Sequence, residues 1–187
     1  MSYLTQKTIK SSVSLSGVAL HSGLQVGICI KPAVPDSGIV FKRVDLKNHN
    51  LVYPNFMNVS NTSLNTTVEN EFGAKVSTIE HLMGALFGLG IDNALIEIDN
   101  EEVPILDGSA KEFIEKIILT GIDVSDQPIK IIKINNEIKY SEGERFISAK
   151  PSTLTLDIDF ELKYSNPLIG NQRNVVKVYE DDLTDLF

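Results

Sequence analysis

The sequence predicts an α+β fold: a two-layer sandwich in which a sheet is backed by two helices, in a duplicated two-domain plan whose second domain is incomplete. Residues 77–89 and 110–119 each carry apolar side chains at helical spacing, and alternating apolar segments surround them. A new series of strand-like segments begins after Gln127, which indicates the repeat. Because a sheet must cover its apolar face with another layer, strands mixed with two amphipathic helices predict a sandwich.

Several alternating or apolar segments of the first domain predict strands. A turn between Gly17 and Gly23 separates the first two and contains His21. Loops often carry function, so His21 could line a site or could simply be an exposed turn residue. The predicted strands are residues 7–15, 24–31, 39–44, 64–68 and 93–98.

The stretch from Ser77 to Gly90 predicts the first helix. Ser77 with Glu80 matches a capping box, and Gly90 matches the left-handed residue that ends many helices. At 100° per residue, one face is apolar and the opposite face is small, which would let another group approach closely. The apolar face holds Ile79, Leu82, Met83, Leu86 and Phe87, and the opposite face holds His81, Gly84, Ala85 and Gly88.

The second helix follows an Asp107-Gly108 turn. Ser109 with Glu112 matches another capping box, and Gly121 ends the helix. Its predicted buried face holds Phe113, Ile114, Ile117 and Ile118. We place the first domain at residues 1–125.

Residues 126–187 predict the start of a second domain. Its predicted strands are residues 128–134, 137–140, 146–150, 154–162 and 175–178, and residues 180–187 resemble the beginning of a helix. These strands have no helical layer to cover them, so we expect an exposed apolar patch that favours self-association. The patch would include some of Ile131, Leu154, Leu156, Ile158 and Phe160.

Composition excludes several classes of protein. The net charge of −8 and the lack of a basic cluster argue against a nucleic-acid partner. The one cysteine, Cys29, excludes an internal disulfide. No apolar run reaches membrane-spanning length, and the first residues have no signal-peptide pattern. We therefore expect a cytoplasmic protein without stable membrane insertion.

Glu80 and His81 are adjacent at the start of the first predicted helix. An imidazole can hold a metal ion, while a neighbouring carboxylate takes a proton from metal-bound water, as metal-assisted hydrolysis requires. Alternatively, Glu80 only completes the capping box and His81 is an exposed helix residue. Four residues after His81 stands Ala85, so this helix offers one metal ligand rather than two.

Four blocks of sequence carry a family resemblance. Residues 16–23, 76–82, 88–93 and 104–110 resemble, in order and spacing, the UDP-3-O-acyl-N-acetylglucosamine deacetylases, and Asn171-Gln172-Arg173 also resembles this family. These are the zinc-dependent enzymes of the first committed step in bacterial lipid A synthesis. The resemblance covers essentially the whole chain.

The resemblance implies two α+β domains with an active site between them, and a UDP-sugar lipid as substrate. It implies that His81 is a zinc ligand and Glu80 the general base. Leu64, Asn65 and Thr66 match the loop and strand that approach the zinc and bind substrate. His21 and Asp107 match positions near the site.

The sequence also departs from the family. The family's other two zinc ligands form a His-x-x-x-Asp motif, and a further catalytic histidine follows it, whereas this sequence has three histidines, at positions 21, 49 and 81. The alternative interpretation is therefore a non-catalytic fragment, or half of a split enzyme, that is inactive alone. A stand-alone binding module on the same fold is a third possibility, against which the Glu80-His81 context argues.

Overall fold

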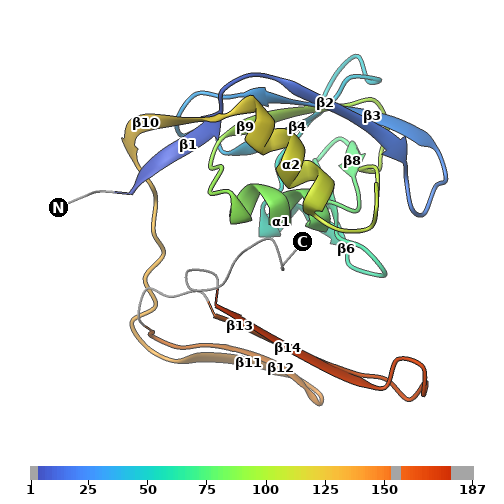
Figure 1. Cartoon of the computed structure of the whole chain (residues 1–187), viewed down its shortest axis with the longest axis vertical. Helices are drawn as coiled ribbons and strands as arrows, with labels where there is room; N and C mark the ends of the chain where they lie inside the picture. Colours follow the sequence, from blue (N-terminus) through green and yellow to red (C-terminus); the bar gives the residue numbers. More distant parts are fainter. Residues whose placement is uncertain (1–3, 153–156, 178–187) are drawn as a thin grey trace. The chain divides into compact units, whose positions relative to one another are not determined.

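The computed structural model describes residues 4–152 and 157–177. The chain divides between Ile129 and Lys130 into two compact units. The first unit contains both helices and the sheets that they cover (Figure 1).

A five-stranded sheet forms the first layer of this unit. Its strand order is β2-β3-β9-β4-β5, in which β4 and β9 are parallel and the other neighbours are antiparallel. The strands are β2 (Val13–Val18), β3 (Gln25–Pro32), β4 (Ile39–Arg43), β5 (Leu51–Val52) and β9 (Ala94–Ile98).

The helices α1 (Glu80–Gly88) and α2 (Lys111–Thr120) lie on one face of this sheet (Figure 1). Alternate residues of the strands face them, so Val26, Ile28 and Ile30 of β3 are buried while their neighbours are partly or fully exposed. This is the pattern of an antiparallel sheet with one covered face. The predicted α+β sandwich is confirmed. Among the described residues, no helix is long and apolar enough to cross a membrane.

A second pairing closes one edge of the unit. Strand β1 (Thr5–Ile9) pairs antiparallel with β10 (Ile122–Pro128). The single strand predicted at 7–15 is wrong, because the structure has two strands there: β1 ends at Ile9 and β2 begins at Val13. The Lys10 amide, just after β1, donates to the Gly121 carbonyl. The strand predicted at 128–134 is also wrong, since the structure has no strand between Pro128 and Ile138.

A smaller antiparallel sheet precedes α1. It consists of β6 (Val59–Asn61), β7 (Thr67–Glu69) and β8 (Lys75–Val76), after the short helix η1 (Phe56–Asn58). The strand predicted at 64–68 begins only at Thr67, because Leu64 has a φ of +70° and cannot continue an extended strand.

The first helix begins at Glu80, three residues after the predicted cap. The capping box is wrong: the Ser77 hydroxyl donates to the Glu101 carbonyl, and Glu80 accepts from Thr66. Gly90 has a φ of +68°, which confirms the left-handed end of the helix. Leu82, Ala85 and Leu86 are buried, whereas Phe87 is 71% exposed. The two predicted faces are therefore wrong at Ala85 and Phe87.

The second helix begins at Lys111, two residues after its predicted cap. The Ser109 hydroxyl accepts the Lys111 amide, but Glu112 makes no reciprocal bond, so this capping box is also incomplete. Phe113, Ile114 and Ile117 are buried as predicted, whereas Ile118 is 56% exposed. Gly121 ends the helix with a φ of +79°.

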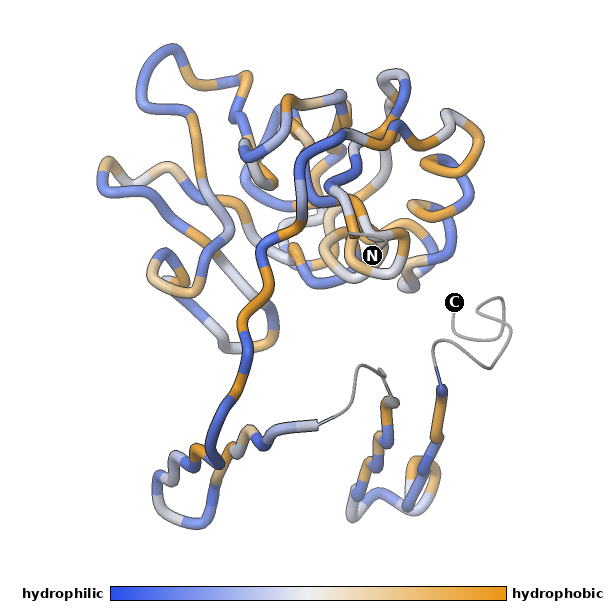
Figure 2. The backbone as a smooth tube through the Cα atoms, turned by 90° about the vertical axis from the view of Figure 1, so that its left-hand side faces the viewer, coloured by the Kyte–Doolittle hydropathy of each residue, from blue (hydrophilic) through white to orange (hydrophobic). Residues whose placement is uncertain are grey.

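The second unit contains two antiparallel hairpins. They are β11 (Ile138–Glu142) with β12 (Arg145–Ala149), and β13 (Asp157–Lys163) with β14 (Asn171–Lys177). Hydropathy alternates along β13 (Figure 2), whereas β14 begins with four polar residues, and none of the side chains described from Lys130 onward is buried. Ile131, Ile158 and Phe160 are exposed as predicted. Leu154, Leu156 and the helix start predicted at 180–187 lie outside the described residues.

Candidate active site

Glu80 and His81 occupy the first turn of α1. The Glu80 side chain is exposed, and its carboxylate accepts a hydrogen bond from the Thr66 amide at 3.2 Å. His81 is half-buried, and its imidazole makes no hydrogen bond to any of the described residues. The carboxylate is thus held by one backbone donor while keeping access to water, and no described residue occupies the imidazole nitrogens.

A sharp bend at Thr78 leads the chain from β8 into α1. Thr78 has a φ of +54° and is 2% exposed. A β-branched residue in this region is a true outlier, so the surrounding contacts must hold it there. Its hydroxyl donates to Glu102 at 3.0 Å and accepts from the Asn65 amide group at 3.3 Å.

The predicted substrate-binding residues form a loop beside this bend. Thr66 binds Glu80 through its amide, and Asn65 links Thr78 to the Thr67 hydroxyl. Leu64 is 90% exposed and makes no comparable bond among the described residues. The structure therefore brings Asn65 and Thr66 to the start of α1 and leaves the Leu64 side chain in solvent.

His21 is joined to the same region by its backbone rather than its side chain. The His21 amide donates to Glu102 at 2.9 Å, and Glu102 also accepts from Thr78. The imidazole of His21 is exposed. Thus the Glu102 carboxylate is hydrogen-bonded both to the His21 turn and to Thr78, which stands two positions before Glu80.

Asp107 has a different local role. Its carboxylate accepts from both the amide and the hydroxyl of Ser109 at 2.9 Å, and these bonds hold the pKa of Asp107 below its ordinary value. In the part of the chain that the structure describes, no hydrogen bond links Asp107 to Glu80 or His81. Asp107 shapes the turn that leads into α2.

Sequence reasoning missed Glu102, which is 3% exposed. Burial raises the pKa of its carboxyl, but hydrogen bonds from the His21 and Ser22 amides and the Thr78 hydroxyl outweigh burial, so the pKa is lowered overall. In the sequence, the adjacent Glu101 and Glu102 indicate a solvent-exposed turn, and no helical or strand periodicity indicates that Glu102 is buried. The one sequence feature that could have pointed to Glu102 is its position directly before the apolar Val103-Pro104, where the last family-like block begins.

The described residues contain no complete metal site. Across 4–152 and 157–177, no three His, Cys, Asp or Glu side chains are grouped so that they could hold a metal ion. His81 has the free imidazole that one zinc ligand requires, and a catalytic zinc normally takes three protein ligands. The described residues therefore offer one candidate ligand, His81, beside a carboxylate, and not a complete ligand set.

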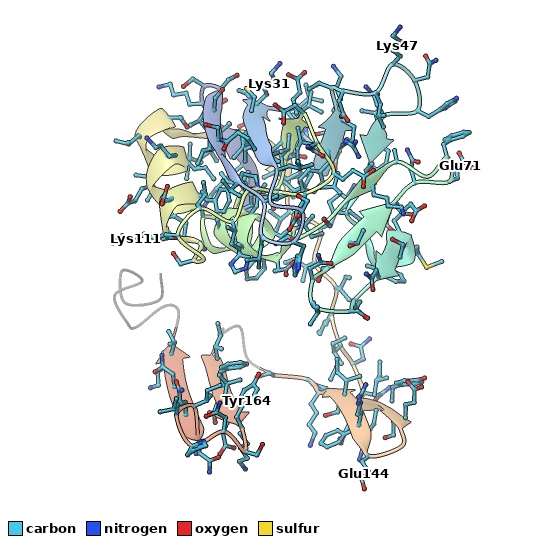
Figure 3. All side chains as sticks on the ribbon, turned by 90° about the vertical axis from the view of Figure 1, so that its right-hand side faces the viewer. Lys31, Lys47, Glu71, Lys111, Glu144 and Tyr164 are labelled. Carbon is cyan, nitrogen blue, oxygen red and sulfur yellow. The ribbon has the colours of Figure 1, made fainter. Side chains whose placement is uncertain are left out.

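A separate hollow of about 530 Å³ lies between β5 and the β7–β8 turn, away from these residues. His49 stacks on Phe72 there, with ring centroids 3.8 Å apart. Glu71 of the same turn projects outward (Figure 3). Neither Glu80 nor His81 lines the hollow.

Comparison with known proteins gives consistent results. The family model for UDP-3-O-acyl N-acetylglycosamine deacetylase matches residues 6–185. The UDP-3-O-acyl-N-acetylglucosamine deacetylase of Nautilia profundicola is 42% identical over 170 residues, which are 91% of this chain and 57% of the relative. The enzyme of that name from Syntrophus aciditrophicus is 38% identical over 176 residues, 94% of this chain and 55% of the relative. The chain spans about half the length of the curated relatives that it matches.

Proposed function

Because the chain belongs to the UDP-3-O-acyl N-acetylglycosamine deacetylase family, we propose that it takes part in hydrolysing the N-acetyl group of UDP-3-O-acyl-N-acetylglucosamine, in the first committed step of lipid A synthesis. The observation that carries the proposal is the exposed Glu80 carboxylate, fixed by the Thr66 amide beside the free imidazole of His81. A cytoplasmic location, expected from the sequence, is part of the same proposal.

In this proposal Glu80 is the general base. Its carboxylate accepts one backbone hydrogen bond, so the second oxygen is free to take a proton from an attacking water. The same group, once protonated, would return the proton to the leaving amine. The two products would be acetate and a free amino sugar.

His81 would hold a zinc ion. Zinc, when bound, lowers the pKa of water and polarises the amide carbonyl. The described residues provide one candidate ligand rather than the three that a catalytic zinc normally takes. Asn65 and Thr66 would contact substrate at the edge of the site, because they already border Glu80 and Thr78.

The second candidate is that these 187 residues act as a non-catalytic fragment or as half of a split enzyme. They would then provide the base and one ligand but turn over no substrate alone. The ligand count in the described residues favours it. Of the other histidines, His49 is stacked on Phe72 and the His21 imidazole makes no hydrogen bond to a described residue.

Two assays test the proposal. Calorimetry and acetate release on the 187-residue chain should show weak zinc binding and no turnover. In a hybrid, the matched 170 residues of the Nautilia profundicola deacetylase are replaced by those of this chain, and this protein should release acetate. A folded, zinc-loaded hybrid without turnover would contradict the proposed activity. Turnover by the chain alone would contradict the fragment interpretation.

A further inference from the structure

We propose that Glu102 is a positioning residue of this site: its buried carboxylate ties the His21-Ser22 turn to Thr78, and through Thr78 it fixes the start of the helix that carries Glu80 and His81. The inference rests on the proposed function for its catalytic consequence, but its structural part can be tested without turnover.

The first half of the link is a pair of backbone hydrogen bonds. The amides of His21 and Ser22 each donate to a different oxygen of Glu102, both at 2.9 Å. Successive backbone amides that converge on one anion form a compact anion-binding concavity. Because the carboxylate is 3% exposed, water does not compete for these bonds, and the turn is held by its main chain while the His21 imidazole stays exposed.

The second half of the link is the Thr78 hydroxyl, which donates to the carboxylate oxygen that also binds His21. Thr78 holds a left-handed conformation with a φ of +54°. Such a conformation persists only where neighbouring contacts impose it, and it is common at functional sites. Glu102 provides one of these contacts and Asn65 another.

The backbone around Glu102 keeps the carboxylate at this junction. On one side, the Ser77 amide donates to Glu101 and the Val103 amide donates to Ser77. On the other side, Ala19 bridges Pro104, and the Ile105 amide donates to Val18. The segment is thus bonded both to the strand that leads to His21 and to the strand that leads to α1.

A buried charge needs a reason. An apolar side chain could fill the same space without the cost of removing a carboxylate from water. Only an acceptor with two oxygens can satisfy the two amides of the turn and the Thr78 hydroxyl together. That donor set joins the His21 turn to the bend before Glu80, which is why we assign Glu102 to the site rather than to general packing.

The test is amide hydrogen exchange on the 187-residue chain. In Glu102→Gln, the new amide group cannot accept from both backbone donors, so exchange at His21, Ser22 and Thr66 should rise about tenfold or more, as expected for local opening. Amides of Ile28 and Ile96, inside the sheet, should not change. Asp99→Asn is the matched control, because Asp99 also accepts a backbone amide, that of Gly27, at 2.8 Å. Because the oxygen of the new side chain can still accept this single bond, exchange should change little, and only near Gly27.

The outcomes separate positioning from stability. A uniform rise that includes Ile28 and Ile96 would show a merely structural role, and no rise at His21 and Ser22 would also overturn the proposal. If Glu102→Gln does not fold, Thr78→Val removes only the second half of the link and should raise exchange at Thr66 more than at Ser22. Equal effects at both would contradict the proposal.

The catalytic consequence is measured in the hybrid deacetylase. Glu102→Gln should lower kcat with little change in KM, since substrate contacts remain while the base is misplaced, and Asp99→Asn should leave both unchanged. If the unmodified hybrid has no turnover, the proposed function fails, while the exchange experiment still decides the role of Glu102. A variant with unchanged kcat would restrict Glu102 to shaping the turn and overturn its assignment to the site.

Discussion

The two units of this chain use similar strands with different results. In the first unit, the alternating side chains of β3 and β9 are buried beneath two helices, and Phe113 of α2 is fully buried. In the second unit, β13 alternates as well, yet its Phe160 is 57% exposed, and Phe146 of β12 is 68% exposed. Strands can therefore pair without a covering layer, but a covering layer is needed to form a core.

The same ion pair occurs in both units with the same geometry. Arg43 binds Asp45, and Arg173 binds Asp159, each through two hydrogen bonds of 2.6 and 2.8 Å. In both pairs the hydrogen bond from arginine holds the aspartate pKa below its ordinary value. The Arg43 side chain is 5% exposed and that of Arg173 is 63% exposed. Arg43 also lies 3.6 Å from Glu101 and donates to the Lys75 carbonyl, so the first pair is both more buried and more extensively bonded than the second.

The largest expected effect is on the core of the first unit. Phe113→Ala removes a fully buried ring and should lower the free energy of unfolding by about 3–5 kcal/mol. The exposed Phe146→Ala is its control and should change this free energy by less than about 0.5 kcal/mol. Urea denaturation followed by circular dichroism measures both. Similar losses in the two variants would mean that the second unit contributes to the same core.

The ion pairs provide the next comparison. Asp45→Asn leaves the buried Arg43 without its closest anion, and should cost about 1–3 kcal/mol of unfolding free energy. This is below the value for a fully buried pair, because Asp45 is 34% exposed and Glu101 lies 3.6 Å from Arg43. Asp159→Asn should have no measurable effect, since exposed pairs contribute little. A larger loss from Asp159→Asn than from Asp45→Asn in urea titrations would reverse the comparison.

Acid should destabilise the first unit in part through Glu102. Its folded pKa lies below the ordinary value of 4.5, so its contribution to stability is present above pH 4.5 and is lost as pH falls through the folded pKa. Thermal denaturation between pH 3 and 7 should therefore show a shallower acid loss in Glu102→Gln than in the unmodified chain. Parallel curves for the two proteins would show that this carboxyl does not titrate with folding.

The smallest expected effect is on association. The exposed apolar side chains of the hairpins favour weak self-association of the 187-residue chain. Replacing Phe146 and Phe160 together by serine should lower the average mass seen in sedimentation, while serine at the exposed Phe72 of the first unit should not. An unmodified chain that is monomeric at all concentrations would contradict this expectation.

The fold was predictable where a local signal and tertiary packing agree. Gly90 and Gly121 both have a positive φ at the end of a helix, of +68° and +79°, and their positions alone indicate a glycine-favouring end. The first capping box failed because its groups bond elsewhere: Ser77 donates to the Glu101 carbonyl, and Glu80 accepts from Thr66, fourteen residues earlier. In the second, Ser109 accepts the Lys111 amide, but Glu112 makes no reciprocal bond among the described residues. Phe87 was misplaced because helical spacing does not show which apolar side chain faces the sheet.

Residue patterns alone predicted only the first turn of the candidate site, and Asn65 and Thr66, which border it, came from the family resemblance. Glu80 and His81 stand together in the sequence, and the structure places both in the accessible first turn of α1. Glu102 could not be found by spacing, since its partners His21 and Thr78 lie 81 and 24 residues away. Contacts of such separation depend on the register of the strands, which no short pattern contains.

The assignment of Glu80 as the base is tested most directly by one pair of variants in the hybrid deacetylase. Glu80→Gln should lower kcat about 10²- to 10⁴-fold, as expected for loss of a general base, with zinc content unchanged. Glu71→Gln is the matched control: this glutamate is exposed at the edge of the separate hollow, and the variant should retain full activity. Near-full turnover by Glu80→Gln, in a protein whose zinc content equals that of the unmodified hybrid, would contradict the account.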